Sequence, residues 1–137
     1  MINARPALLL ALAMILLVGT GCGPLSTAED SGVRVLAPSV ALELLETERH
    51  RQIIDVRTLQ EFSEGHLDNA VLMDFYEDDF AAAIDDLDRD QPYVIYCRSG
   101  NRSGQTRQLM EDLGFTDVVD IDGGIESWLA EGLPTTR

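Results

Sequence analysis

The sequence predicts an α/β fold with a central parallel five-stranded sheet and helices on both faces. From Val33 onward, short runs rich in valine and isoleucine alternate five times with stretches of helical periodicity. Such alternation is typical of β-α units, in which successive strands pair in parallel. Residues 92–96, "PYVIY", are uniformly apolar, as expected of a central strand that is covered on both faces. The 137 residues suffice for one compact domain.

Local signals place the individual helices. Ser39 stands where a side-chain oxygen would cap a first helix. Thr58 and Glu61, three residues apart, form the capping-box pattern at the start of a second, short helix. Gly114 is placed to end the longest helix. The expected strands are 33–36, 52–56, 70–75, 92–96 and 117–121, and the expected helices are 39–48, a short one from 58, then 76–87, 103–113 and 124–132.

The charge balance excludes one class of partner. The formal net charge is -14, and all ten cations are arginines, because the chain contains no lysine. Nucleic acid is therefore not expected as a partner, since neutralising its phosphates requires clustered cations. Two of the arginines, Arg98 and Arg102, lie within five positions of Cys97 and are candidates for binding an oxyanion.

The first 22 residues are typical of an export signal. The apolar run Ala7–Val18 would reach about 18 Å as a helix, short of the roughly 30 Å hydrocarbon core of a membrane. Cys22 follows small residues and resembles the lipidated cysteine of bacterial lipoproteins, although Gly19 stands where an aliphatic residue is usual. We expect residues 1–22 to be a signal peptide ending at a lipidated Cys22. Simple cleavage and a retained anchor are the alternatives, both leaving Cys22 incidental.

The rest of the chain divides into a linker and one domain. Residues 23–32 are rich in glycine, serine and threonine and read as a flexible linker, and residues 33–137 form the domain. The expected location is outside the cytoplasm, on a lipid anchor at the bacterial cell envelope. If Cys22 is lipidated or removed, Cys97 is the one thiol of the domain, and it has no disulfide partner and no companions for a zinc site.

The segment "CRSGNRS" places Cys97 between the end of a predicted strand and the start of a helix. In parallel sheets, ligands bind beyond the carboxyl ends of the strands. Gly100 permits the positive φ angles with which successive amides can point at one anion. Such surroundings stabilise a thiolate relative to a thiol. We predict that Cys97 is a nucleophile, cradled by backbone amides of residues 98–103. The candidate substrate-binding residues are Arg98, Ser99, Gly100, Asn101, Arg102 and Ser103.

This segment resembles the active-site loop of the rhodanese sulfurtransferases. The resemblance extends to Asp55–Phe75, "DVRTLQEFSEGHLDNAVLMDF", and to Asp120–Pro134, "DIDGGIESWLAEGLP", with Asn69 and Leu72 departing from the usual residues. It implies a three-layer sandwich and a two-step reaction without cofactor or metal. Cys97 would take sulfane sulfur from a small sulfur-containing anion such as thiosulfate, and pass it to a low-molecular-weight thiol, a protein thiol or cyanide.

The resemblance also suggests supporting residues. Asp55 and Arg57 match the first family motif, and we expect them to form an ion pair that supports the fold beside the loop. His66 could lie near the pocket, although a turn histidine bonded to the backbone is the simpler interpretation, and an ionised thiol needs no general base. Glu61 is explained by its place in the capping box.

Two other functions share features of this pattern. Phosphatases with a similar cradle carry five residues between cysteine and arginine, whereas four residues separate Cys97 from Arg102. The shorter ring fits a persulfide sulfur better than a phosphate. The main alternative is a rhodanese-like module that binds partners or senses sulfur or oxidants without significant turnover.

Overall fold

The structure, a computed structural model, describes residues 32–137, and the predicted signal peptide, Cys22 and most of the linker lie outside this range. Five strands form one sheet in the order β1-β5-β4-β2-β3, and every neighbouring pair is parallel. The predicted parallel five-stranded sheet is therefore confirmed. The elements are β1 (Val33–Leu36), α1 (Pro38–Thr47), β2 (Gln52–Asp55), α2 (Leu59–Glu64), β3 (Ala70–Leu72), α3 (Phe80–Asp85), β4 (Tyr93–Tyr96), α4 (Asn101–Asp112), β5 (Val118–Ile121) and α5 (Gly124–Ala130).

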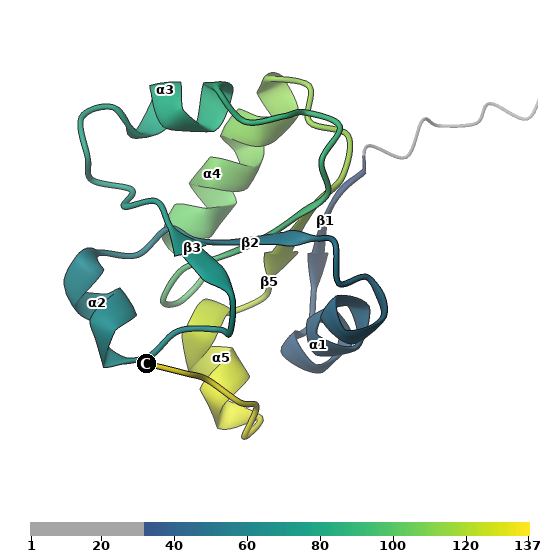
Figure 1. Ribbon diagram of the computed structural model, residues 1–137, viewed down its shortest axis with the longest axis vertical. Helices are drawn as coiled ribbons and strands as arrows, with labels where there is room; N and C mark the ends of the chain where they lie inside the picture. The colour runs from purple at the N-terminus through teal and green to yellow at the C-terminus, as the bar shows by residue number, and fades with distance from the viewer. Residues whose placement is uncertain (1–31) are drawn as a thin grey trace, which may run out of the picture.

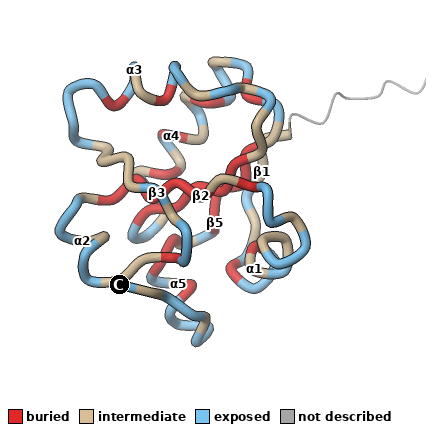
Figure 2. Tube along the Cα trace, viewed as in Figure 1, coloured by how far each residue is buried: buried red, intermediate tan, exposed pale blue. Residues whose placement is uncertain are grey.

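Helices cover both faces of the sheet, as predicted. Helices α3 and α4 lie on one side and α1 and α5 on the other (Figure 1). Successive residues of a strand point to opposite faces, so Ile54 and Ile95 pack under α3 and α4, while Ile53 and Val94 pack under α1 and α5. Figure 2 shows buried chain concentrated in the sheet, with the outer sides of the helices exposed. The result is a three-layer sandwich with two apolar cores.

The central position of β4 determines where the reactive segment lies. Strand β4 pairs with β2 on one side and with β5 on the other, and all four of its residues are buried. Because Cys97 directly follows Tyr96, the sulfur lies at the carboxyl end of the innermost strand. None of the helices within residues 32–137 has the length and apolar character needed to cross a membrane.

The structure corrects the predicted start of two helices. Ser39 does not cap α1: Ala37 occupies the N-cap, Pro38 takes the first turn, and no side chain caps the helix. Proline suits this position because it has no N–H to leave unsatisfied and its φ is already helical. Helix α4 begins at Asn101 rather than 103, since Gly100 is its N-cap with φ 97°. The connection after Cys97 is thus only three residues long.

Two other elements are shorter than predicted by three residues or more. Strand β3 ends at Leu72 rather than 75. Just beyond it, the Asp74 carboxylate accepts a hydrogen bond from the Tyr76 amide, and the chain turns there. Helix α3 runs only from Phe80 to Asp85. In contrast, the capping box of Thr58 and Glu61 at the start of α2 is present as predicted.

Candidate active site

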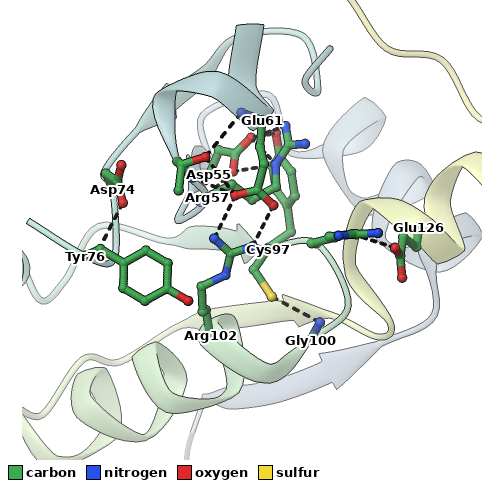
Figure 3. Close-up of polar contacts among 12 residues, drawn as sticks. Asp55, Arg57, Glu61, Asp74, Tyr76, Cys97, Gly100, Arg102 and Glu126 are labelled. Atoms are coloured by element: carbon green, nitrogen blue, oxygen red, sulfur yellow. Dashed lines mark hydrogen bonds and ion pairs between the residues drawn. The ribbon is translucent and has the colours of Figure 1, made fainter. Parts of the chain in front are cut away.

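Cys97 lies at the carboxyl end of β4 with 1% of its surface exposed. Its Sγ accepts a hydrogen bond from the amide of Gly100 at 3.0 Å (Figure 3). Gly100 has the positive φ that the sequence suggested, and this conformation turns its N–H back towards the sulfur. Among the described residues, this amide alone donates to Sγ, where the sequence predicted a ring of amides from 98 to 103. In place of the predicted ring, one backbone hydrogen bond reaches the sulfur, from the N-cap residue of α4.

The first turn of α5 holds the backbone of the loop in place. The amide of Ile125 donates to the Cys97 carbonyl at 2.9 Å, and the amide of Glu126 donates to the Arg98 carbonyl at 3.0 Å. Gly124, at φ 61°, approaches so closely that a Cβ there would lie 2.4 Å from the Cys97 carbonyl oxygen. The Gly-Gly pair after β5 is therefore a contact surface for the loop. This contact was not predicted from the sequence.

Arg102 is tied to α2 by a two-point ion pair. Its Nη1 and Nη2 donate to the two carboxylate oxygens of Glu61 at 2.8 and 2.7 Å (Figure 3). The Tyr76 ring centroid lies 5.6 Å from the guanidinium carbon, a cation–π distance. The hydrogen bonds to Glu61 raise the pKa of Arg102 above its ordinary value, and the neighbouring Cys97 sulfur acts in the same direction. Sequence reasoning missed this pair, because it explained Glu61 by the capping box alone.

Arg98, the other arginine of the loop, lies in a different environment. Its side chain is 67% exposed, and its Nε donates to Glu126 at 2.7 Å. A cleft of about 550 Å³ lies beside it, lined by residues of α2, α5 and the C-terminal segment. Arg98 therefore belongs to the outer rim of the site, whereas Arg102 lies close to the sulfur.

A buried polar cluster fixes the ends of β2 and β4. Asp55 is fully buried and accepts hydrogen bonds from Arg57 and, at 2.6 Å, from the hydroxyl of Tyr96. Arg57 also donates to the carbonyl of Gly65 at 2.7 Å. Burial and then the Asp55 charge raise the pKa of Tyr96 well above its ordinary value, so its hydroxyl stays a donor. The expected Asp55–Arg57 ion pair is present, and it braces the strand that carries Cys97.

The remaining candidates face solvent or make contacts elsewhere. Ser99 and Asn101 are exposed, and the Asn101 side chain accepts from Gln105 on its own helix. Ser103 is fully buried in the first turn of α4. The His66 Nδ1 lies 3.0 Å from the Phe62 carbonyl oxygen, so this ring nitrogen is hydrogen-bonded to the backbone. The structure thus brings Gly100 and Arg102 to Cys97 and leaves Ser99 and Asn101 facing solvent.

The part of the chain that the structure describes offers no group of three His, Cys, Asp or Glu side chains placed to hold a metal ion. The site offers a cysteine sulfur with one backbone donor and nearby guanidinium groups. Fold and site together define a class: a parallel α/β domain that presents a single cysteine between a central strand and the following helix.

Comparison with known proteins identifies the family. Residues 37–131 match the model of the rhodanese-like domain, and the chain belongs to this family. It is 36% identical over 94 residues to a protein of Pseudomonas aeruginosa named thiosulfate sulfurtransferase GlpE, covering 68% of this chain and 81% of the relative. It is 30% identical over 102 residues to the putative sulfurtransferase YtwF of Bacillus subtilis, covering 74% of this chain and 96% of the relative.

A solved structure agrees with the fold. The crystal structure of a rhodanese-related protein from Thermoplasma volcanium superposes with a TM-score of 0.65 at 29% identity, covering 75% of this chain and 97% of that one. The three-layer rhodanese-like architecture expected from the sequence is therefore confirmed.

Proposed function

We propose that the protein is a rhodanese-type sulfurtransferase that carries sulfane sulfur on Cys97. One observation carries the proposal: the Cys97 sulfur sits at the carboxyl end of the central strand and accepts the Gly100 amide. That placement holds a nucleophile where parallel α/β domains bind ligands. The sulfurtransferase names of the relatives from Pseudomonas aeruginosa and Bacillus subtilis support the same reaction.

The reaction proceeds by two displacements at sulfur. The Cys97 thiolate attacks the outer sulfur of a donor such as thiosulfate, a new S–S bond forms, and sulfite leaves with the electron pair of the old bond. An acceptor thiolate or cyanide then attacks the outer sulfur of the persulfide, and the Cys97 thiolate leaves. The Gly100 amide serves both steps, because it stabilises negative charge on Sγ when the thiolate attacks and again when it departs.

Intact-mass measurement tests this proposal directly. Incubation with a sulfane donor should add about 32 Da, the mass of one sulfur atom, and subsequent cyanide should remove it. The Cys97→Ser variant should gain nothing. If no sulfane donor adds mass to the wild-type chain, the protein is a binding or sensing module of the same fold and the proposal is wrong.

We further propose that the protein is exported and lipid-anchored at the bacterial cell envelope. The proposal rests on the apolar run Ala7–Val18 and on the small residues that precede Cys22. Expression of the full chain in a bacterial host with radiolabelled palmitate should give a labelled protein in the membrane fraction. The Cys22→Ser variant should take up no label. An unlabelled wild-type protein would contradict the anchor.

A further inference from the structure

We propose that Glu61 sets the charge selectivity of the site, so that it discriminates against dianionic donors such as thiosulfate and favours sulfane-sulfur donors with a single negative charge. Thiosulfonates and thiol persulfides are donors of this class. The inference rests on the proposed function, because it concerns the donor that loads Cys97.

Glu61 binds both terminal nitrogens of Arg102, which an oxyanion would also use. A guanidinium grips a tetrahedral anion through two parallel N–H groups. In Arg102 both terminal nitrogens donate to Glu61, at 2.8 and 2.7 Å. An anion that arrives at the sulfur therefore meets an arginine with one N–H of each terminal nitrogen engaged and with its charge already balanced by a carboxylate.

Glu61 is also held in place by the start of α2. Its Oε2 also accepts from the Thr58 amide at 3.0 Å and from the Thr58 hydroxyl at 2.9 Å. These bonds close the capping box of α2, so displacing the carboxylate would undo the start of a helix as well as the ion pair. The hydrogen bonds from Arg102, followed by those from Thr58, lower the pKa of Glu61 to about 2, and the group is an anion at any working pH.

The other cation of the loop, Arg98, lies on the outer rim of the site. Arg98 is paired with Glu126, and both side chains are more than half exposed, so solvent screens this pair. Around Cys97 the two arginines are thus matched by two carboxylates. A donor with two negative charges gains little net attraction there, and its second charge adds repulsion from the fixed carboxylate of Glu61. One unit charge several ångströms from another alters binding on the order of tenfold in a partly screened site.

Thiosulfate and methanethiosulfonate are a matched pair of probes. In the second compound a methyl group replaces one oxygen, which removes one charge and preserves the sulfane sulfur. In both cases the Cys97 thiolate attacks that sulfur and one S–S bond replaces another. The leaving group, sulfite or methanesulfinate, departs with the electron pair of the broken bond, and no external oxidant or reductant is needed.

The experiment compares kcat/KM for the two donors, with cyanide as acceptor, at constant ionic strength. Glu61→Gln removes the charge yet keeps the amide oxygen that the capping box and Arg102 can use, because glutamine also serves in this motif. We expect kcat/KM for thiosulfate to rise about tenfold and that for methanethiosulfonate to change less than about threefold. Glu43→Gln, an exposed position on α1, changes the net charge equally and should leave the ratio of the two donors unchanged.

Glu61→Asp separates charge from structure. It retains the carboxylate, so the ratio should stay near that of the wild type even if both rates fall. An unchanged ratio in Glu61→Gln, or an equal fall for both donors, would overturn the proposal and leave Glu61 a structural residue. In that outcome the donors still load Cys97 and the sulfurtransferase function stands. Failure of the wild-type protein to accept sulfur from either donor would overturn both.

Discussion

The loop around Cys97 is held from two sides, and the two sides use different parts of the chain. On the α5 side the contacts are made by backbone: amides of residues 125 and 126 bind the carbonyls of Cys97 and Arg98, and Gly124 packs directly against them. On the α2 side the contacts are made by side chains, through the ion pair of Arg102 and Glu61. The α5 side should therefore be intolerant of added atoms, and the α2 side sensitive to changes of charge.

The largest effect should come from an added methyl group on the α5 side. In Gly124→Ala the new Cβ would lie 2.4 Å from the Cys97 carbonyl oxygen, at a φ that disfavours alanine. We expect the free energy of unfolding to fall by about 2–4 kcal/mol, and turnover to fall at least about tenfold, because the sulfur is displaced. Urea unfolding and thiosulfate turnover measure the two effects.

A matched control exists for this change. Gly132 also has a positive φ, 71°, but a Cβ there would meet nothing within 4 Å. Gly132→Ala should thus cost only the backbone strain, about 1–2 kcal/mol, and leave turnover nearly unchanged. Equal behaviour of the two variants would show that the close approach of α5 does not position the loop.

The next largest effect should come from the α2 side. Arg102→Ala removes the cation beside the sulfur and leaves the partly buried Glu61 without its main partner. We expect a loss of about 1–3 kcal/mol in stability and about tenfold or more in turnover. Arg102→Lys keeps the charge but not the paired geometry of the guanidinium. Its stability and turnover should therefore lie between those of the wild type and those of Arg102→Ala. A lysine variant with wild-type activity and stability would show that charge alone matters there.

Acid should weaken the α2 side selectively. Arg102 first, and then Thr58, lower the pKa of Glu61 from 4.5 to about 2 in the folded state. A carboxyl with a lowered pKa stabilises the fold fully above its unfolded pKa, and this contribution is lost as pH falls towards 2. The difference in free energy of unfolding between wild type and Glu61→Gln should shrink by about 1–3 kcal/mol over that window. A difference that is independent of pH would contradict the ion pair.

The smallest effect should come from the side chain of Arg98. It is 67% exposed, and its partner Glu126 is 52% exposed. Exposed ion pairs contribute about 0–1 kcal/mol, so Arg98→Ala should change stability by no more than that. The backbone carbonyl that α5 binds is still present in the variant, and we expect turnover to fall less than about threefold. A loss as large as that of Arg102→Ala would make Arg98 a direct substrate contact.

Local patterns in the sequence were sufficient for most of the fold. The alternation of strands and helices, the capping box of Thr58 and the positive φ of Gly100 each depend on a few neighbouring residues. Where a prediction was wrong, a nearby residue had a stronger preference: Pro38 began α1 before Ser39 could cap it. Asn69, which replaces a usual glycine, adopts φ 62°, a conformation that asparagine tolerates better than most residues.

The site was only partly predictable, because its partners are distant in sequence. Cys97 and Gly100 are three residues apart, and their contact follows from the loop itself. Glu61 and Arg102 are separated by 41 positions, and no periodicity or spacing relates them. Gly124 is likewise distant in sequence from the loop. Its role is visible only from how closely its backbone approaches the Cys97 carbonyl oxygen. The sequence therefore located the cysteine of the candidate site but not the residues that surround it from α2 and α5.

The direction of β1 has a consequence for how the molecule is presented to its surroundings. Val33 enters the sheet at the end where all five parallel strands begin, while Cys97 lies at the end where they finish. Any attachment made through residues that precede β1 would therefore hold the domain at the end of the sheet where the strands begin, opposite Cys97. The carboxyl end of the sheet, where Cys97 lies, would then point away from the surface to which the chain is fastened, and a partner could reach that end without approaching the surface.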